Sequence, residues 1–389
     1  MSAVLPEPEI DARVRFGRES RPEVCSGGTM TTTDLPATMP AAVLKGLRKV
    51  VVEDRPLPAI GPTEVLLEVS HCGICGSDLH FMVEWEGAAK PGAIEGHEYS
   101  GTVVALGAEV EGWSIGEQVV GGPTPRCGVC EYCLAGRPSL CAERGKVGAG
   151  ESDWQGAFAG YKAVNAAEML RVPDGLSMRH AALVEPMAVA LHGITRSGGA
   201  RTDARYLVTG GGPIGFLSVA ALKAAGVDDV VVSEPHQGRR DLCARLGARV
   251  VDPSELKIPM MPHDLVEEPF DVVLECSGHR EAMEAALAQL KRGGTLVLVG
   301  AGIHRPRFDN NRILLNELTI TGSFVYDADG FTHALELLAS GRVPLDVLVE
   351  ADDVPLDGLL DAAISLHEGR LAAKVMVVPR VGTAMKGER

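Results

Sequence analysis

Two short stretches, HCGICGSDLH at residues 71–80 and GHEY at residues 96–99, decide how this chain can fold. Cys75 offers a thiolate, His97 an imidazole and Glu98 a carboxylate, which are the ligand types of a catalytic zinc ion. The stretches are too far apart in sequence for a local zinc finger, so a tertiary fold must bring them together. The pattern predicts a zinc site with one open coordination position.

Each of these residues also has a simpler interpretation. His97 taken alone is as consistent with an ordinary core histidine, and Cys75 with a small hydrophobic residue. Cys72 and Cys75 form a CxxC pair, which occurs in redox proteins. No thioredoxin-like pattern surrounds the pair, so the metal-site interpretation is favoured.

A second cysteine motif has the spacing C-x2-C-x2-C-x7-C, formed by Cys127, Cys130, Cys133 and Cys141. Four thiolates on one short segment suit a closed, tetrahedral structural zinc site, which leaves no position open for a substrate. Four cysteines also hold iron–sulfur clusters, and zinc modules occur in nucleic-acid-binding proteins. The formal net charge of −15 disfavours the nucleic-acid interpretation.

A glycine-rich turn lies in the middle of the chain, within residues 204–235. Gly210, Gly212 and Gly215, with Pro213 and Ile214 between the last two, form G-x-G-x-x-G. The motif follows an apolar segment typical of a strand and opens a segment typical of a helix, which is the context a dinucleotide-binding turn requires. The first glycine makes the turn, the second lets the backbone approach a pyrophosphate, and the third allows close helix–strand packing.

The choice of coenzyme depends on the residues after the next strand. Glu234 lies 19 positions after Gly215, where an acid hydrogen-bonds the adenine-ribose hydroxyls and repels a 2′-phosphate. This indicates NAD rather than NADP. Arg239 and Arg240 lie close by and are the opposing signal, because arginine accommodates a 2′-phosphate.

The remaining pattern predicts an α/β chain with two architectures. Residues 41–58 indicate a β-hairpin, and residues 64–76 and 100–122 indicate further strands, so this part should be an irregular antiparallel β domain. In the second part we expect strands at 270–278, 295–302 and 316–324, and an amphipathic helix over 279–294 that ends in glycines. Together with the glycine turn these predict a doubly wound parallel sheet.

GICGSDLH at 73–80, followed by GHEYSGTV at 96–103, resembles the zinc-containing medium-chain alcohol dehydrogenases, and most nearly their polyol, threonine and 2,3-butanediol branch. The resemblance runs from about Met39 to about Pro379. It implies a GroES-like catalytic domain and a Rossmann coenzyme domain. The expected domains are a catalytic domain at 39–190 and 326–380, with a structural-zinc lobe at about 123–145, and an NAD-binding domain at 191–325. Residues 1–38, which have no clear apolar period, are expected to be a disordered or extraneous tail, and residues 381–389 a second tail.

The resemblance also implies roles for single residues around the zinc ion. Glu185 lies in an apolar helical segment, residues 177–194, and matches a glutamate that in this branch either binds zinc or holds its water; a helix-terminal surface glutamate is the alternative. Ser77 and His80 match a proton relay, although His80 also suits a plain surface position. Asp78 matches a position that orients the ligand histidine.

Further implied roles concern the coenzyme. The resemblance places Arg239 near the adenine and the backbone of Val299 and Gly300 near the nicotinamide. Lys374 matches a basic position that contacts coenzyme phosphate in some relatives. His192, Cys243 and Cys276 are interpreted as packing residues.

Composition sets the outer bounds. A length of 389 residues, 46% of them hydrophobic and 23% charged, predicts about two globular domains. The acidic balance argues against nucleic acid and anionic membranes as partners, and no apolar run has the length of a membrane span. The nine cysteines are better explained by metal than by disulfides, which favours a reducing cytoplasm.

The sequence thus predicts an oxidoreductase with two zinc ions, one catalytic and one structural, that moves hydride between a secondary alcohol, diol or polyol and NAD through an alkoxide on zinc. Its partners would be a small alcohol or ketone substrate and, as a dimer or tetramer, further copies of the chain. The alternatives are an NADP-dependent aldehyde or ketone reductase and a catalytically silent nucleotide-binding protein on the same scaffold.

Overall fold

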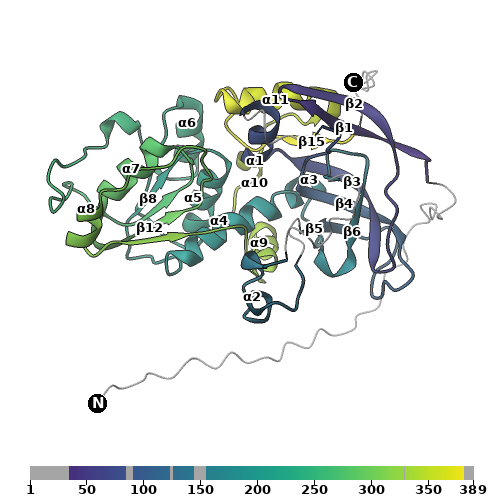
Figure 1. The fold of residues 1–389 in the computed structure, drawn as a ribbon, viewed down its shortest axis with the longest axis horizontal. Helices are drawn as coiled ribbons and strands as arrows, with labels where there is room; N and C mark the ends of the chain where they lie inside the picture. Colours follow the sequence, from purple (N-terminus) through teal and green to yellow (C-terminus); the bar gives the residue numbers. More distant parts are fainter. Residues whose placement is uncertain (1–34, 85–90, 123–125, 144–154, 328, 381–389) are drawn as a thin grey trace, which may run out of the picture.

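The computed structural model describes residues 35–84, 91–122, 126–143, 155–327 and 329–380. Two lobes lie side by side (Figure 1), one built on a mostly antiparallel sheet and the other on a parallel sheet. The greater part of both predicted tails lies outside the described residues. No described helix is long and apolar enough to cross a membrane.

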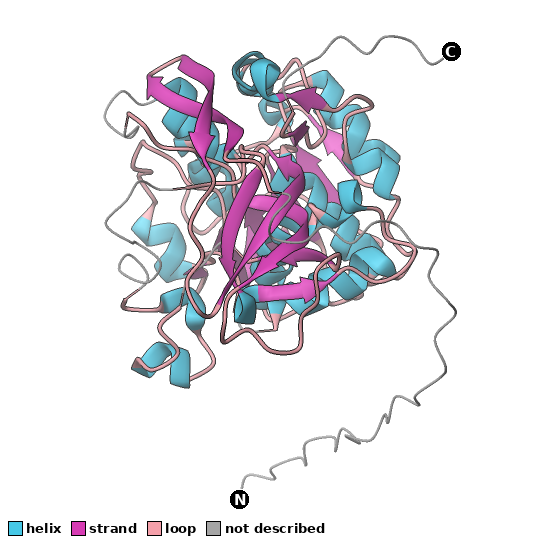
Figure 2. Cartoon of the chain, turned by 90° about the vertical axis from the view of Figure 1, so that its right-hand side faces the viewer, coloured by secondary structure: helices cyan, strands magenta, loops and turns pink. Residues whose placement is uncertain are grey.

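The first lobe contains a seven-stranded sheet, which faces the viewer in Figure 2. Its path runs β14-β15-β3-β4-β5-β7, and β6 pairs with β3. The strands are β3 (Glu64–Gly73), β4 (Glu98–Leu106), β5 (Gln118–Gly121), β6 (Tyr161–Asn165), β7 (Met169–Arg171), β14 (Val354–Pro355) and β15 (Met376–Val378). The predicted hairpin is confirmed as β1 (Thr38–Gly46) and β2 (Lys49–Pro56), which pair with each other.

The register of β3 against β4 joins the two stretches that carry the metal ligands. The strands are antiparallel, and Gly73 at the end of β3 lies opposite Glu98 at the start of β4. A Cβ on Gly73 would lie 2.3 Å from Oε2 of Glu98, so only glycine leaves room for that carboxylate. Just beyond β3, the short helix α1 (Gly76–Leu79) begins with Cys75 as its N-cap.

The second lobe is the predicted doubly wound domain. Its six strands are parallel, in the order β10-β9-β8-β11-β12-β13, and helices cover the sheet (Figure 1). The strands are β8 (Tyr206–Thr209), β9 (Val230–Ser233), β10 (Arg249–Val251), β11 (Phe270–Glu275), β12 (Leu290–Leu298) and β13 (Thr319–Gly322), and the helices are α5 (Pro213–Ala224), α6 (Gln237–Arg245), α7 (Arg280–Ala288) and α8 (Asn310–Leu315).

One apolar core continues from the parallel sheet to the junction of the lobes. It contains buried side chains of β8 and α5 together with those of α4 (Val184–Arg196) and α9 (Gly330–Ala339). Helix α4 crosses the predicted boundary at residue 190, and α9 follows the boundary at 325. The remaining helices of the return segment are α10 (Leu345–Leu348) and α11 (Leu359–His367). The domain boundaries stay predictions.

Two predicted elements differ from the structure. The helix over 279–294 ends already at Ala288, and the glycines lie inside β12, where Gly293 has a φ of +72° and the register against β11 shifts. The segment 177–194 is split into α3 (Met178–Ala181) and α4, with Leu183 at the N-cap of α4. The Ser177 side chain caps α3 by accepting from the His180 N–H, which the apolar periodicity did not reveal.

Candidate metal and coenzyme site

Cys75, His97 and Glu98 lie together at the ends of β3 and β4. One ligand atom from each, a sulfur, a ring nitrogen and a carboxylate oxygen, lies within 4.8 Å of the others. Glu98 is fully buried, and its Oε2 has no hydrogen-bond partner among the residues that the structure describes. Burying a carboxylate oxygen without a partner costs free energy of folding. This oxygen is therefore in the position expected of a metal ligand.

The other oxygen of Glu98 is paired with Lys374, which corrects the prediction made for that lysine. The Lys374 Nζ donates to Oε1 of Glu98 at 2.8 Å and to the Ile74 carbonyl at 2.9 Å. Lys374 is only 1% exposed, and Glu98 raises its pKa against the opposing effect of burial. The lysine therefore balances a buried charge inside the metal site and does not extend toward a coenzyme phosphate.

Asp78 fixes the backbone next to the cluster. Its Oδ2 accepts from the Cys75 N–H at 2.9 Å, and its Oδ1 lies 3.8 Å from Nδ1 of His97. Burial raises the pKa of Asp78, although His97 acts in the opposite direction. Its distance from His97 is longer than a hydrogen bond, so the firm contact of Asp78 is with Cys75.

Glu185 lies near this cluster but is not one of the three grouped ligands. It occupies the first turn of α4 and is 5% exposed, with no hydrogen-bond partner found among the described residues. Burial raises its pKa to about 7, while the charge of His97 lowers it. The structure thus brings Glu185 close enough to His97 for their charges to interact. That Glu185 binds zinc directly stays a prediction.

The donor set fits a zinc ion. Burial lowers the pKa of His97, but Cys75, Asp78 and Glu185 outweigh this effect and raise it well above its ordinary value. A position where anionic groups stabilise positive charge, lined by sulfur and nitrogen, matches the preference of zinc. Cys75, His97 and Glu98 would hold such an ion.

The four-cysteine segment fits a second, closed site. The four sulfurs lie within 4.8 Å of one another, with Cys127 to Cys141 at 3.6 Å and Cys127 to Cys133 at 4.0 Å. Sulfurs placed tetrahedrally around zinc at its usual bond length lie about 3.8 Å apart, whereas a disulfide is far shorter. The Cys130 N–H donates to Cys127, and the Cys133 backbone lowers the pKa of the Cys130 thiol.

The glycine turn forms the cradle that the motif predicts. Gly210 has a φ of +90°, and a Cβ on Gly215 would lie 1.8 Å from the Gly210 carbonyl oxygen. Gly212 is the N-cap of α5 and Pro213 its first residue, followed by Ile214. A Cβ on Gly212 would meet nothing closer than Nη1 of Arg239 at 4.0 Å, so this helix N-terminus has the open space and the positive charge that suit a phosphate.

Glu234 and Arg239 both lie beside this turn and both have partners. The Glu234 carboxylate accepts from the Gly211 N–H at 2.7 Å and from the His236 N–H at 2.9 Å. Arg239 donates to the Leu366 carbonyl at 2.6 Å, which joins α6 to the end of α11. Glu234 is thus at the expected place after β9, and in this structure it also braces the glycine turn.

The loop after β12 closes the same edge of the parallel sheet. The N–H groups of Val299 and Gly300 both donate to the Glu275 carbonyl, at 2.9 and 2.8 Å. A Cβ on Gly300 would lie 2.3 Å from the Gly278 nitrogen. In open parallel sheets ligands bind beyond the carboxyl ends of the strands, and both the glycine turn and this loop lie there.

The predicted relay residues lie on the turn that follows Cys75. Ser77 is inside α1 and His80 is its C-cap. Both are half-buried. Nδ1 of His80 hydrogen-bonds Oε2 of Glu84 one turn on. His192 is buried, and its Nδ1 lies 3.8 Å from Oδ2 of Asp327.

Three carboxylates in or beside the site were missed by the sequence analysis. Burial raises the pKa of Glu95, two residues before His97, to about 7. The Glu275 side chain accepts from the N–H groups of Ser277 and Gly278 at 2.9 and 3.2 Å and so fixes the loop at the end of β11. Glu84 contacts two histidines. Proximity to GHEY could have singled out Glu95, whereas no local pattern distinguishes Glu275.

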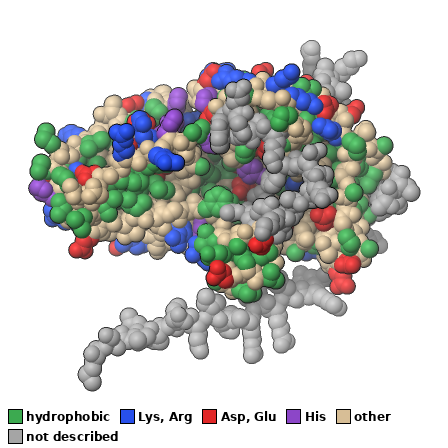
Figure 3. Space-filling view, viewed as in Figure 1, with side chains coloured by type: hydrophobic (Ala, Val, Ile, Leu, Met, Phe, Trp, Pro, Cys, Tyr) green, Lys and Arg blue, Asp and Glu red, His purple; other side chains and the backbone are tan. Residues whose placement is uncertain are grey.

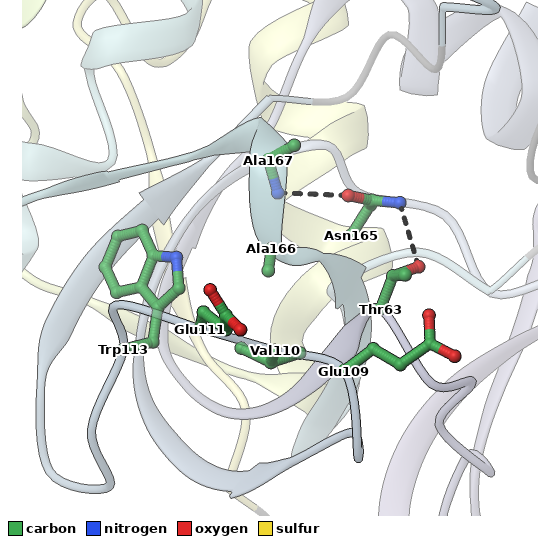
Figure 4. Close-up of a pocket in the computed structure, with 8 residues that line it drawn as sticks. All are labelled: Thr63, Glu109, Val110, Glu111, Trp113, Asn165, Ala166 and Ala167. Atoms are coloured by element: carbon green, nitrogen blue, oxygen red, sulfur yellow. Dashed lines mark hydrogen bonds between the residues drawn. The ribbon is translucent and has the colours of Figure 1, made fainter.

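The surface of the molecule has concave features. The space-filling view shows a hollow between the two lobes, with acidic and histidine side chains at its edge (Figure 3). A shallow pocket of about 380 Å³ is lined by other residues, Thr63, Glu109, Val110, Glu111, Trp113, Asn165, Ala166 and Ala167 (Figure 4). Asn165 accepts from the Ala167 N–H within it. The pocket contains none of the predicted site residues.

Comparison with known proteins agrees with this geometry. Residues 61–174 match the alcohol dehydrogenase GroES-like domain, and residues 213–340 match the zinc-binding dehydrogenase family. Sorbitol dehydrogenase of Bacillus subtilis (strain 168) is 33% identical over 90% of this chain and 99% of its own length.

Two solved structures extend the comparison. The 2R,3R-butanediol dehydrogenase of Bacillus subtilis has a TM-score of 0.76 and 29% identity, covering 88% of this chain and 100% of its own. A zinc-binding dehydrogenase of Sinorhizobium meliloti 1021 bound to NADP has a TM-score of 0.77 and 31% identity, with the same coverage of 88% and 100%.

The lobes and the sites therefore define a zinc-dependent oxidoreductase that transfers hydride between an alcohol and a nicotinamide coenzyme. The chain belongs to the zinc-containing medium-chain alcohol and polyol dehydrogenases. This confirms the predicted fold class and the family resemblance.

Proposed function

We propose that this enzyme oxidises secondary alcohols, diols or polyols to ketones with NAD⁺, using a zinc ion held by Cys75, His97 and Glu98, with Glu185 as a further ligand or as the residue that holds a water. The observation that carries the proposal is the group of three ligand atoms within 4.8 Å at the ends of β3 and β4. The likeness to a sorbitol and a butanediol dehydrogenase supports this substrate class.

Each residue around the metal site would have its own role in the reaction. A zinc ion bound here supplies a Lewis acid for the alcohol oxygen. Lys374 balances the buried Glu98 at 2.8 Å, and Asp78 fixes the Cys75 backbone. Ser77 would relay the alcohol proton by way of a coenzyme ribose hydroxyl to His80, since an imidazole titrates in the neutral range.

The coenzyme would lie across the carboxyl ends of the parallel strands. Its pyrophosphate would face Gly210, Gly212 and Gly215, and its nicotinamide would face the backbone of Val299 and Gly300. Glu234 directly follows β9 and is buried, and a carboxylate there favours a free 2′-hydroxyl over a 2′-phosphate. We therefore propose NAD as the coenzyme.

A second candidate is an NADP-dependent reductase of aldehydes or ketones. Arg239 lies beside the glycine turn, Arg240 donates to the Glu234 carbonyl at 2.6 Å, and the Sinorhizobium structure holds NADP. Either arginine would become available to a 2′-phosphate by giving up a backbone contact. The two candidates differ in the ratio of kcat/KM for NAD⁺ and NADP⁺.

Further parts of the proposal concern stoichiometry and assembly. The four cysteines would hold one structural zinc, which makes two zinc ions per chain. We propose a dimer or tetramer that uses the edge strand β13 of the parallel sheet. Free thiolates at both metal sites suit a reducing compartment such as the cytoplasm.

The test combines metal analysis with turnover. Zinc would be counted per chain after purification without chelator, and NAD⁺ and NADP⁺ reduction would be followed over a panel of secondary alcohols, diols and polyols. We expect two zinc ions and faster turnover with NAD⁺. Cys75→Ala should fold, keep one zinc and lose turnover, because only the catalytic ligand set is broken. Equal rates with both coenzymes would show that Glu234 does not select NAD⁺ over NADP⁺. Retained activity in Cys75→Ala would show that Cys75 does not belong to the catalytic zinc site.

A further inference from the structure

His80, Glu84 and His367 form a chain of side chains that starts at the C-cap of α1, the helix that follows Cys75. Nδ1 of His80 hydrogen-bonds Oε2 of Glu84, and Oε1 of Glu84 lies 3.0 Å from Nδ1 of His367. His80 and Glu84 bound the turn η2 (His80–Glu84), whereas His367 ends α11. One carboxylate thus bridges two imidazoles from distant parts of the sequence.

His80 and Glu84 each favour the charged form of the other. The hydrogen bond from Glu84 raises the pKa of His80 and outweighs the effect of burial. Conversely, His80 lowers the pKa of Glu84, and His367 adds to that effect. Glu84 therefore stays ionised near neutral pH and favours the protonated form of His80.

Other charged groups packed on the turn are engaged elsewhere. The Arg48 N–H donates to the Met82 carbonyl at 2.7 Å, and its Nε lies 3.5 Å from the Val83 carbonyl. The Asp78 carboxylate is hydrogen-bonded to the Cys75 N–H. From α11 and the turn after it, Glu368 pairs with Arg370 at 2.8 Å. Among the described residues, Glu84 is the charged group that acts most directly on His80, and His367 acts on Glu84.

A backbone group of the coenzyme lobe also raises the pKa of His80. The backbone of Ala301 favours the protonated ring in the same direction as Glu84. Ala301 directly follows Val299 and Gly300, the loop at the carboxyl edge of the parallel sheet. Because Glu84 occupies Nδ1, Nε2 is the ring nitrogen left for exchange of a proton at this edge.

We propose that Glu84 is a positioning residue for the reaction: it holds the Nδ1 side of the His80 ring and leaves Nε2 to take up a proton, and His367 fixes Glu84 from the other side. This rests on the proposed function, in which His80 accepts a proton. Oxidation of an alcohol sends a hydride to the nicotinamide and one proton to Nε2 of His80. The resulting imidazolium keeps its Nδ1–H on the Glu84 carboxylate, which takes no proton, and later releases its Nε2 proton to water. A carboxylate that orients a histidine and stabilises its cation in this way is a recurring device in enzymes.

The experiment uses the purified holoenzyme and two readouts. Nuclear magnetic resonance titration would follow the His80 imidazole in the wild type, in Glu84→Gln and in Glu84→Asp, with Glu368→Gln as a matched control on a nearby surface carboxylate. We expect the His80 midpoint to fall in Glu84→Gln, to recover in part in Glu84→Asp and to stay unchanged in the control. In His367→Ala, the His80 Nδ1–H should exchange faster with water, because Glu84 is held at one side only.

The second readout is the pH dependence of kcat/KM for alcohol oxidation. A lower His80 midpoint makes the neutral ring available at lower pH, so the acidic limb should move to lower pH in Glu84→Gln. The plateau should fall about tenfold, since general bases contribute more than this in total. The inference is overturned if either the His80 midpoint or the acidic limb is the same in Glu84→Gln as in the wild type. A wild type that reduces neither coenzyme with any alcohol would instead refute the proposed function, and the inference with it.

Discussion

At the scale of single residues, the site depends on how buried charges are matched. Glu98 is fully buried, and its two oxygens differ: one is paired with Lys374, and the other has no hydrogen-bond partner within the described part of the chain. A buried ion pair is costly to break, because the remaining charge has no solvent to stabilise it. Lys374 should therefore matter for folding and metal binding more than any exposed lysine does.

Lys374→Met tests this directly. We expect the free energy of unfolding to fall by about 3–5 kcal/mol, because Glu98 is left buried and unpaired. Urea denaturation followed by circular dichroism would measure the change. The control is Lys291→Met, which breaks the half-exposed pair with Asp271 and should cost less than about 1 kcal/mol. Equal losses in the two variants would contradict the role assigned to Lys374.

At the scale of elements, two local geometries carry the function. The β3–β4 register delivers Glu98 opposite Gly73, and the turn from β8 into α5 leaves an open helix N-terminus. In both, a side chain in place of glycine would clash with a neighbouring atom. A Cβ on Gly73 would lie 2.3 Å from Oε2 of Glu98, and a Cβ on Gly215 would lie 1.8 Å from the Gly210 carbonyl oxygen. These local structures therefore depend on glycines, which leave room for neighbouring atoms, as well as on the residues that bind.

The glycine turn yields a paired prediction. Gly215→Ala should lower the free energy of unfolding by about 1–3 kcal/mol, since its Cβ would overlap the Gly210 carbonyl. Gly212→Ala has room in the protein, with the nearest atom at 4.0 Å, and should fold normally but bind coenzyme more weakly. Thermal melts without coenzyme and fluorescence titration with NADH separate the two effects. Normal NADH affinity in Gly212→Ala would show that the pyrophosphate does not approach this backbone.

The four-cysteine segment yields a prediction about metal content. Cys130→Ser should lower the zinc content by one ion per chain and lower the melting temperature, because the binding free energy of a structural zinc is part of the folding free energy. The matched control is Val129→Ser, a 76% exposed neighbour that offers no ligand. Metal analysis and calorimetry provide the readouts. A Cys130→Ser protein with full zinc content and unchanged melting would rule out a closed metal site.

At the scale of the whole molecule, the parallel sheet has an open edge at β13. Exposed apolar side chains lie on the preceding helix, Leu314 at 70% and Leu315 at 54%. Edge strands offer unpaired backbone groups, and exposed apolar residues next to one favour association. These features support the proposed dimer or tetramer.

Light scattering after size exclusion tests the assembly. We expect the wild type to have the mass of a dimer or tetramer, and the double variant Leu314→Lys with Leu315→Lys to have a smaller mass, because the lysines would have to be desolvated. Val51→Lys, on β2 of the other lobe, is the control and should leave the mass unchanged. A monomeric wild type would refute the proposed oligomer, and an unchanged mass in the double variant would place the interface elsewhere.

The sequence by itself determined the class of the protein, because its decisive signals are local. The spacing of Cys127, Cys130, Cys133 and Cys141, the turn at 210–215 and the ligand types in GHEY all depend on neighbours within a few residues. It also predicted the β1–β2 hairpin and the parallel sheet, whose periods of polar and apolar residues follow from strand geometry. The end of α7 was predicted too late, because the pattern does not show that Gly293 lies inside a strand.

Only the tertiary structure decided which distant groups meet. Glu98 and Lys374 are 276 positions apart, and their contact depends on β15 pairing beside β3, a choice that no local pattern encodes. The same holds for Arg239 with the Leu366 carbonyl and for Glu84 with His367. Local spacing fixes contacts within a turn or a strand, whereas strand order and packing bring distant charges together, and burial then sets how strongly these charges interact.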